Sequence, residues 1–294
     1  MIKATGGYYY VETGTGPDTA LVECRARGIF RKEGRSPYVG DMVDIQLDGD
    51  GVGTVNEIHP RKNDLIRPPL ANLDYMVVVI SVADPPFNAF VTDKFLAILE
   101  HKDIEPLIAI TKSDLGDSTA IQARFRKAGY PVFAVHTQGE AAGQGVSELK
   151  DALAGRLCAF SGNSGVGKSS LLNAIDPHFQ LETGDISKKL GRGRHTTRHV
   201  ELFQLDNGAL IADTPGFSTV EVTRMSAITK ESLAWCFRDM EPYLEQCKFT
   251  DCSHTTELGC AVLAAVAAGD IDAGRHESYM QLYSELKDLK EWEQ

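Results

Sequence analysis

Short hydrophobic stretches alternate with polar residues at the start of the chain, and turn-forming residues separate them. Over residues 1–67 these stretches are YYYVET, ALVECRARGIF, GDMVDIQL and GVGTVNEI. Glycine, proline and aspartate interrupt them, as in GTGPD and DGDG. Several short strands in so short a segment predict a small antiparallel β-barrel of the oligonucleotide-binding (OB-fold) type. An SH3-like barrel would give the same pattern, so both barrels stay open at this point.

The pattern changes after Leu73, where strand-like and helix-like segments begin to alternate. Residues 75–83, YMVVVISVA, form a continuous apolar run of strand length, as expected for a strand buried on both faces. Alternating strands and helices predict a parallel sheet covered by helices. Further strands are predicted at 105–110, 130–136 and 157–162, helices at 91–102, 118–129 and 146–155, and a strand pair with an Asp-Asn-Gly turn at 199–216.

The chain is predicted to be a multi-domain protein. Consecutive prolines in RPPL, residues 67–70, fit neither a helix nor a central strand and predict a linker. After about Val222 the strand pattern ends, and residues 229–244 and 274–293 have helical spacing. We therefore expect three domains: a β-barrel at 1–67, an α/β domain at 68–222 and a helical domain at 223–294.

Residues 162–169, GNSGVGKS, match the phosphate-binding loop pattern G-x-x-x-x-G-K-[ST]. The match follows a predicted strand and precedes a helical segment, which is the context that this loop requires. Its glycines let successive backbone N–H groups face the phosphate oxygens. Lys168 is expected to bridge the outer phosphates, and the Ser169 hydroxyl to bind Mg²⁺. The predicted nucleotide contacts of this P-loop are Gly162, Asn163, Ser164, Gly165, Val166, Gly167, Lys168, Ser169 and Ser170.

Residues 111–114, TKSD, end another predicted strand and indicate which base is bound. The Asp114 carboxylate can accept hydrogen bonds from the N1–H and the exocyclic amine of guanine. Adenine lacks this pair of donors and would leave the acceptor unsatisfied. Lys112 is expected to lie along the base plane, with Thr111 and Ser113 completing the guanine site. A P-loop ATPase or kinase is therefore disfavoured.

The segment DTPG, residues 213–216, ends a predicted strand as the magnesium-side motif of P-loop folds does. Asp213 is expected to hold Mg²⁺ through water, and the Gly216 N–H to face the γ-phosphate; a plain turn would give the same letters. The guanine motif precedes the P-loop, the reverse of the ordinary order. Ligands bind at the carboxyl ends of parallel strands whatever order the chain visits them. The order therefore predicts a circularly permuted parallel sheet with an intact site.

The cysteines near the C-terminus have the spacing of a metal site. Cys247, Cys252, His254 and Cys260 give C-x4-C-x-H-x5-C. Three thiolates and one imidazole form a closed tetrahedral set, typical of structural zinc rather than of catalytic zinc with an open position. Three core cysteines and a surface histidine at these positions would give the same sequence pattern without binding a metal. The pattern predicts one structural Zn²⁺ that stabilises the helical domain.

Charge and composition restrict the class of partner and the compartment. The net charge of −11 argues against a uniformly basic nucleic-acid binder, yet residues 24–35 and 187–199 each carry five lysines and arginines. Such basic islands suggest local contacts with phosphates, although solvated loops would look alike. No apolar run of membrane-spanning length and no signal-like start is present, and clustered cysteines favour metal over disulfides. We expect a cytoplasmic protein without membrane contact.

The motifs together resemble those of one family. The permuted order and the segments NDLIRP, TKSDL, GNSGVGKSSLLN, GRGRHTTR, DTPGF and CKFTDCSHTTELGCAV are similar, nearly end to end, to the RsgA (YjeQ) family of bacterial ribosome-dependent GTPases. The resemblance implies an OB-fold barrel, a circularly permuted GTPase domain that hydrolyses GTP to GDP, and a C-terminal zinc domain. It also implies a role in late maturation of the small ribosomal subunit, with that subunit and its rRNA as partners; we expect a monomer. Thr111 departs from the general guanine motif, which has Asn there.

Hydrolysis has to come from a residue other than the usual one. Many GTPases place a water-orienting Gln directly after the DxxG glycine, and here that position holds Phe217, which cannot position water. The basic loop GRGRHTTR lies where a switch segment belongs. In it, His195 is predicted to orient the attacking water, and Thr196 or Thr197 to bind Mg²⁺. A loop that only contacts RNA is the alternative, and with it a non-hydrolysing, GTP-switched RNA-binding protein.

Overall fold

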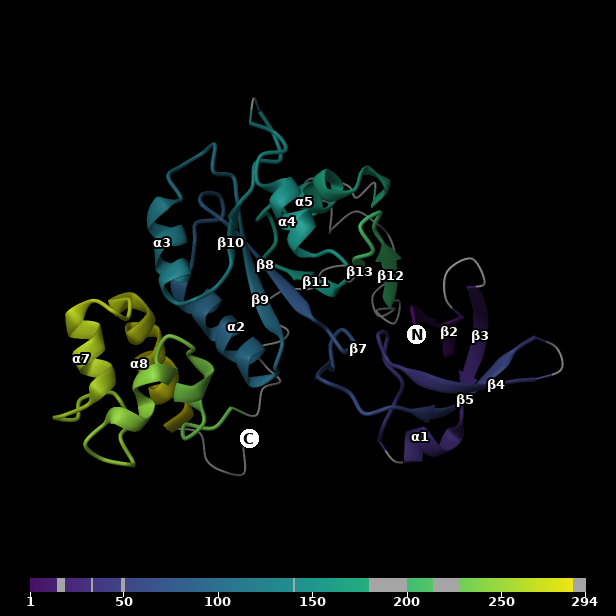
Figure 1. Cartoon of the computed structure of the whole chain (residues 1–294), viewed down its shortest axis with the longest axis horizontal. Helices are drawn as coiled ribbons and strands as arrows, with labels where there is room; N and C mark the ends of the chain where they lie inside the picture. The colour runs from purple at the N-terminus through teal and green to yellow at the C-terminus, as the bar shows by residue number, and fades with distance from the viewer. Residues whose placement is uncertain are drawn as a thin grey trace. The chain divides into compact units, whose positions relative to one another are not determined.

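The computed structural model shown in Figure 1 describes most of the chain, namely residues 1–14, 19–32, 34–48, 51–139, 141–179, 200–213 and 228–287. These residues divide into two compact units. The first unit contains residues 1–75, 153–160 and 200–213, and the second contains residues 76–152, 161–179 and 228–287.

The N-terminal part of the first unit is a five-stranded sheet in the order β1-β2-β3-β5-β4. Neighbouring strands are antiparallel except β3 and β5, which are parallel. The strands are β1 Lys3–Thr5, β2 Tyr8–Thr13, β3 Ala20–Ala26, β4 Val43–Leu47 and β5 Gly53–Ile58. All four apolar stretches predicted here contain a strand, but the end of ALVECRARGIF belongs to a short helix, α1 Gly28–Lys32.

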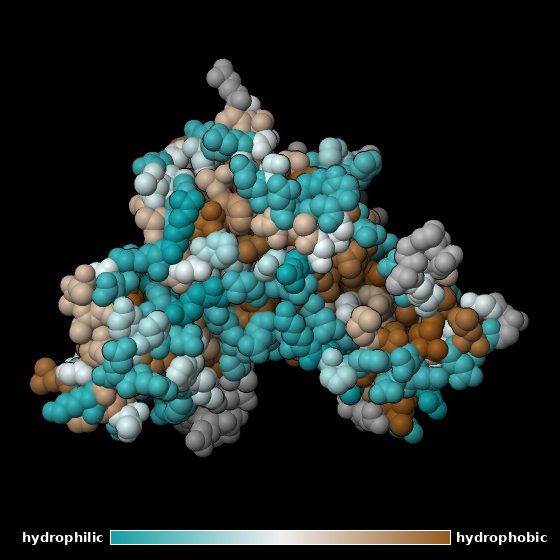
Figure 2. All heavy atoms as spheres, in the orientation of Figure 1, coloured by the Kyte–Doolittle hydropathy of each residue, from teal (hydrophilic) through white to brown (hydrophobic). Residues whose placement is uncertain are grey.

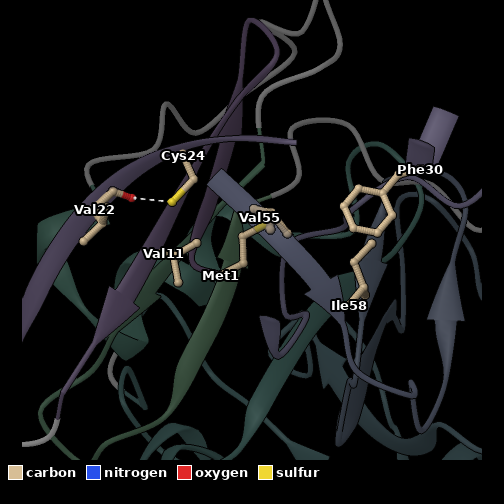
Figure 3. Packing of buried hydrophobic residues seen from close by; sticks show 7 residues of the cluster. All are labelled: Met1, Val11, Val22, Cys24, Phe30, Val55 and Ile58. Carbon is tan, nitrogen blue, oxygen red and sulfur yellow. Dashed lines mark hydrogen bonds between the residues drawn. The ribbon is translucent and has the colours of Figure 1, made fainter. Parts of the chain in front are cut away.

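Side chains from these strands, from α1 and from Met1 form a small hydrophobic core. The buried members of this core, seen in Figure 3, are Met1, Val11, Val22, Cys24, Phe30, Val55 and Ile58. Val22 and Cys24 both point into this core because they are two positions apart, and alternate residues of a strand face the same side. Gly53 is required beside them, since a Cβ there would lie 2.6 Å from the Cys24 sulfur.

Strand β1 joins this sheet to a second group of strands in the same unit. Lys3 and Ala4 pair with β2 on one edge and with β12 on the other. The Lys3 ammonium also lies 3.0 Å from the Glu201 carboxylate across that second edge. Both edges of β1 are therefore occupied at these residues, and no pairing between β1 and β4 is found in the part of the chain that the structure describes.

The second group of strands is β11 Leu157–Ser161, β13 Leu210–Asp213 and β12 Val200–Gln204. β11 and β13 are parallel, whereas β12 and β13 form an antiparallel pair. Their turn is the Asp-Asn-Gly segment, closed by a hydrogen bond of 2.8 Å from the Leu205 N–H to the Ala209 carbonyl. This strand pair confirms the sequence prediction.

The stretch RPPL forms a hairpin rather than the linker expected from its prolines. Residues 66–69 form the turn between β6 Asp64–Leu65 and β7 Leu70–Ala71. Proline suits a turn because its ring fixes the backbone φ angle and because such a position does not require the N–H that proline lacks. The hairpin is anchored from Arg61, which bonds both carboxylate oxygens of Asp41 at 2.8 and 2.9 Å and Asp64 at 3.2 Å.

The second unit has the alternating strands and helices that the sequence predicts. Its strands β8 Tyr75–Ser81, β9 Glu105–Thr111 and β10 Val132–Ala134 lie in the order β10-β9-β8, and β9 and β10 are parallel. β8 and β9 are buried almost throughout, as their continuous apolar sequences require. The helices are α2 Ala89–His101, α3 Thr119–Lys127, α4 Val146–Ala152 and α5 Lys168–Ile175.

The C-terminal helices belong to this second unit, and α8 packs against α2 (Figure 1). They are α7 Ala261–Ala268 and α8 Ala273–Lys287. The segment predicted as one helix at 229–244 is instead two 3₁₀ helices, η4 Leu233–Cys236 and η5 Glu241–Gln246. Phe237 has an extended backbone and Pro242 lacks an N–H, so a continuous α-helix cannot pass through both. No helix in the described ranges is both long and apolar enough to cross a membrane.

Candidate nucleotide site and metal centre

The P-loop connects β11 to α5, and its backbone conformation depends on glycine. Gly165 and Gly167 have φ values of 83° and 90°, in the left-handed region that residues with a Cβ seldom adopt. Gly162 lies against β8, where a Cβ would come within 2.6 Å of the Val79 carbonyl oxygen. Gly167 caps α5, and Lys168 is the first residue of that helix.

The polar side chains of the P-loop lie at the N-terminus of α5. Lys168, Ser169 and Ser170 occupy its first turn and are half-buried, whereas Asn163 and Ser164 are exposed. The N–H groups of a first helical turn lack partners within the helix, and the helix dipole favours an anion there. The structure thus places the predicted phosphate contacts together at an anion-binding helix end, with Val166 buried beneath the loop.

Thr111 links the guanine motif to the P-loop. It ends β9, only 1% of its surface is exposed, and its hydroxyl lies 2.5 Å from the Val166 carbonyl oxygen and 3.1 Å from that of Ile80. The hydroxyl bridges two segments that are 55 positions apart in the chain. The threonine that departs from the general guanine motif therefore still joins the base-reading strand to the phosphate-reading loop.

The rest of the guanine motif lies where β9 ends. Lys112 has a left-handed backbone, and its ammonium donates to the carbonyl of Asp84, in the loop between β8 and α2. Asp114 is exposed, which leaves its carboxylate accessible to a ligand. The Ser113 hydroxyl is buried and has no hydrogen-bond partner among the described residues.

Two further polar groups lie near this edge, and sequence reasoning gave neither side chain a role of its own. The Nδ1 of His136 and the hydroxyl of Ser161 are buried without a hydrogen-bond partner in the described part of the chain. His136 directly follows Val135, whose N–H bonds the Ile110 carbonyl at 2.8 Å, so it lies beside the end of β9. Buried polar groups without partners are rare in folded proteins and suggest contacts with a ligand or water. Burial without a partner leaves no signal in a sequence.

The structure describes only some of the remaining predicted residues of the nucleotide site. Asp213 ends β13, with its backbone opposite Glu201. Gly216, His195, Thr196 and Thr197 lie outside the described residues, and so does Phe217.

The four predicted metal ligands converge on one point. Their ligand atoms all lie within 4.8 Å of one another. The sulfurs of Cys247 and Cys260 are 3.9 Å apart, and each is 3.5 Å from Nδ1 of His254. A tetrahedral zinc ion would set these distances at about 3.8 Å between sulfurs and about 3.6 Å between sulfur and nitrogen, given its usual bond lengths. The donor set and its spacing, completed by Cys252, therefore fit zinc.

Burial disfavours the charged forms of these ligands, whereas two backbone N–H groups stabilise the thiolates that a metal requires. Burial raises the pKa of the Cys252 thiol to about 12, raises that of Cys260 and lowers that of His254, so uncharged groups are favoured until a dication binds. The N–H groups of Ala261 and Leu263 point at the sulfurs of Cys247 and Cys260, at 3.3 and 3.5 Å. Such donors stabilise thiolates.

Glu257 fixes the backbone that carries His254. Its carboxylate accepts hydrogen bonds from the N–H groups of Ser253, Thr255 and Thr256 at 2.9 to 3.0 Å. Desolvation raises the pKa of Glu257, but the hydrogen bonds from Ser253 and its neighbours outweigh this effect and lower the pKa to about 2. This carboxylate is a structural support for the loop.

Comparison with known proteins shows which family this chain belongs to. The family model described as RsgA GTPase matches residues 58–223, and the RsgA N-terminal domain model matches residues 1–55. This chain belongs to the RsgA family. One relative is the small ribosomal subunit biogenesis GTPase RsgA of Shouchella clausii, 42% identical over 99% of this chain and 97% of the relative. The RsgA of Bacillus pumilus is 44% identical over the same shares.

Solved structures show that this RsgA family member has the family fold. YjeQ from Thermotoga maritima superposes with a TM-score of 0.80 at 31% identity, covering 98% of this chain and 99% of that one. YloQ, described as a circularly permuted GTPase, superposes with a TM-score of 0.79 at 38% identity, covering 98% and 94%. The permuted motif order read from the sequence is thus the order of the RsgA fold, and the predicted family is confirmed.

Proposed function

We propose that this chain is a GTPase that hydrolyses GTP to GDP and assists the late maturation of the small ribosomal subunit. The observation that carries this proposal is the nearly full-length similarity to relatives named small ribosomal subunit biogenesis GTPase RsgA. The arrangement at Thr111 supports it, because one hydroxyl joins the guanine motif to the P-loop.

The described residues supply base and phosphate recognition in this proposal. The Asp114 carboxylate accepts from the guanine N1–H and amine, and Lys112 exchanges its bond to the Asp84 carbonyl for a position along the base. The P-loop N–H groups and Lys168 bind the phosphates. Ser169, Asp213 and either Thr196 or Thr197 are the oxygen donors that the sequence predicts for Mg²⁺, which would neutralise phosphate charge.

Water is activated in this proposal by His195, because Phe217 cannot orient it. An imidazole within reach of the attacking water contributes roughly 10²- to 10⁴-fold to the rate. His195 lies in the basic segment 187–199, whose Arg192, Arg194 and Arg198 are suited to contact rRNA phosphates. Contact with the subunit would then place His195 beside the attacking water, which links ribosome binding to hydrolysis.

The N-terminal sheet offers a further surface for the small subunit. Arg25 on β3 lies over the ring of Tyr8 on β2, with 5.1 Å to the ring centroid, and both Arg25 and Arg27 are exposed. Basic and aromatic side chains together suit RNA. Figure 2 shows hydrophobic surface on the N-terminal part of the chain. Leu21 of β3, Ile29 of α1, Met42 just before β4 and Leu47 of β4 are at least half exposed. Such surface residues are typical of binding sites when they gather in a patch.

The finer architecture of this proposal follows the family pattern. The strand order β1-β2-β3-β5-β4 supports an OB-type barrel at 1–67, followed by a permuted GTPase domain at 68–222 and a zinc domain at 223–294. One structural Zn²⁺ is held by Cys247, Cys252, His254 and Cys260, whose geometry fits it. We infer a monomer that works in the cytoplasm, where ribosomal subunits are assembled.

The deciding experiment measures GTP turnover with and without purified small subunits. We expect slow intrinsic turnover, on the order of 10⁻⁴ to 10⁻² s⁻¹ as in unassisted GTPases, and stimulation by the subunit that weakens as salt is added. The variant His195→Ala should lose the stimulation and keep its GTP affinity. A variant stimulated as strongly as wild type would remove His195 from the mechanism.

A second candidate is a GTP-switched RNA-binding protein that does not hydrolyse GTP. The observation that favours it is Phe217 in the position of the water-orienting glutamine. The same turnover assay separates the two, since GTP-dependent subunit binding without GDP production supports the switch alone. If subunits neither bind nor change turnover, the ribosomal role fails for both candidates.

A further inference from the structure

Helix α8 contacts two parts of the second unit through closely spaced residues. His276 and Tyr279 contact the metal loop, by which we mean residues 247–260, and Arg275 contacts α2. All three side chains are at least 95% buried. No motif in the sequence marked them, and neither the P-loop nor the guanine site uses them.

The contacts with the metal loop act on the two peptide planes that flank one predicted ligand. His276 Nε2 donates to the His254 carbonyl at 2.8 Å, and the Tyr279 hydroxyl donates to the Ser253 carbonyl at 2.8 Å. The rotations of these two planes about the His254 Cα are its φ and ψ angles. Fixing both carbonyls therefore fixes the direction in which the His254 imidazole leaves the backbone.

This control matters because His254 has an uncommon backbone conformation. Its φ is 59°, in the left-handed region that residues other than glycine adopt only when their surroundings hold them there. The ring of Tyr279 lies 6.5 Å from that of His254 and stacks on His276, with 6.0 Å between centroids and 23° between planes. The α8 side chains thus hold His254 through hydrogen bonds and ring packing.

Helix α8 is itself held by a buried ion network. Arg275 bonds both oxygens of Asp239 and one oxygen of Asp93, each at 2.8 Å. Asp93 lies on α2 and is 1% exposed, and its second oxygen bonds Arg124 of α3 at 2.5 Å. A bidentate guanidinium contact tolerates little displacement, because both hydrogen bonds depend on its planar geometry. Arg275 directly precedes His276, so the network fixes the place from which His276 reaches the metal loop.

We propose that His276 and Tyr279 are positioning residues of the metal loop, and that the Arg275–Asp93 pair holds α8 where they reach it. Metal affinity then depends on Asp93, a residue of the GTPase helix α2 that touches no metal ligand. The inference rests on the zinc site of the proposed function. Because linkage is reciprocal, an occupied metal loop also stabilises the contact of α8 with α2.

The first test measures zinc affinity by competition with a chromophoric chelator at fixed pH. His276→Leu should weaken binding by roughly 10- to 100-fold, as loss of a group that orients a metal-binding histidine does. His276→Gln should restore most of it, since the side-chain amide can donate to the same carbonyl. Tyr279→Phe keeps the ring and should still weaken binding, because only the donor is lost.

The second test asks whether the link reaches α2. Asp93→Asn should weaken zinc binding by about 5-fold or more, the lower end of ordinary coupling between sites. Glu285→Gln is the matched control, because Glu285 joins the same two helices through an exposed pair with Lys94 at 2.8 Å and should leave zinc affinity unchanged. Circular dichroism checks folding, and Arg275→Lys replaces Asp93→Asn if the latter does not fold.

The outcomes separate this inference from the proposed metal. If wild-type protein purified without chelator holds no zinc, the metal site itself is wrong and the inference falls with it. If wild type binds zinc but His276→Leu and Tyr279→Phe bind it equally well, the site stands and the positioning role is overturned. If Asp93→Asn, or Arg275→Lys where it replaces that variant, keeps wild-type zinc affinity, the link to α2 is overturned.

Discussion

The P-loop and the metal loop both bring polar groups together for a ligand, but they differ in how much of each site is exposed to solvent. Asn163 and Ser164 of the P-loop are exposed. The loop is anchored by a hydrogen bond from the hydroxyl of Thr111, at the end of β9, to the Val166 carbonyl. In the metal loop the ligand atoms already lie within 4.8 Å of one another, and His254 and Cys260 are 6% and 4% exposed. The P-loop is open to solvent, whereas in the metal loop two of the four ligands are buried and the other two, Cys247 and Cys252, are half-buried.

The difference reflects what each site is proposed to hold. A nucleotide has to enter and leave, so its site needs accessible donors on a backbone that is rigid without it. A structural ion stays, so its ligands can be built into the core, and its binding energy becomes folding energy. Substitutions at the nucleotide site should therefore change the affinity for GTP. Substitutions of the metal ligands should change the stability of the folded protein.

Removing two metal ligands is the strongest test of this contrast. The double variant Cys252→Ser, Cys260→Ser should lose zinc and unfold α7 and α8, because the binding energy of such sites is on the order of 10 kcal/mol. Metal analysis and hydrogen exchange measure the two effects. Cys236→Ser is the control, since Cys236 is buried outside the metal set and its loss should leave zinc bound. Zinc retained by the double variant would contradict the assignment.

Changing the base reader should alter affinity without altering stability. Asp114→Asn should weaken GTP binding by roughly 10²- to 10⁴-fold, because two hydrogen bonds to a charged group are lost. Binding of xanthosine triphosphate should increase, since an amide donor then faces a carbonyl. Titration with both nucleotides measures this, and Asp117→Asn, an exposed neighbour in the same loop, serves as control. Equal binding of GTP and ATP by the wild type would refute the guanine assignment.

The buried ion network should matter for stability as the metal loop does. Arg275→Met removes the guanidinium that bonds both oxygens of Asp239 and one oxygen of Asp93. Asp93 then keeps its ion pair with Arg124. The variant should lower the free energy of unfolding by about 3–5 kcal/mol. Lys94→Met removes an exposed pair between the same helices and should cost less than about 1 kcal/mol. Denaturant titration compares them, and equal losses would show that burial of the network does not matter.

The smallest expected effect concerns the anchor of the P-loop. Thr111→Val keeps the β-branched shape that suits a strand but removes the hydroxyl that bonds the Val166 carbonyl. GTP affinity should fall by roughly 5- to 10-fold, the value of about one hydrogen bond. Thr111→Ser should restore it. Unchanged affinity in the valine variant would mean that the loop holds its shape through glycine alone.

The sequence by itself determined the sites whose residues are close together in the chain. The P-loop, the TKSD strand end and the C-x4-C-x-H-x5-C set were readable because glycine conformations and ligand chemistry act within a few residues. The alternation of strands and helices after Leu73 was equally readable, since burial on both faces demands continuous apolar runs. The permuted order followed from where these motifs stand, and the family comparison confirms it.

Other features were decided only by tertiary structure. The pairing of β1 with β12, the bond from Thr111 to Val166, and the ion network of Arg275 join residues that are 55 to nearly 200 positions apart. The break of the 229–244 segment into two 3₁₀ helices and the helix α7 were not predicted either. Local propensity is a weak preference that packing overrides. Whether a buried charge or carbonyl finds its partner depends on which distant segment the fold brings beside it, and a short window of sequence does not contain that segment.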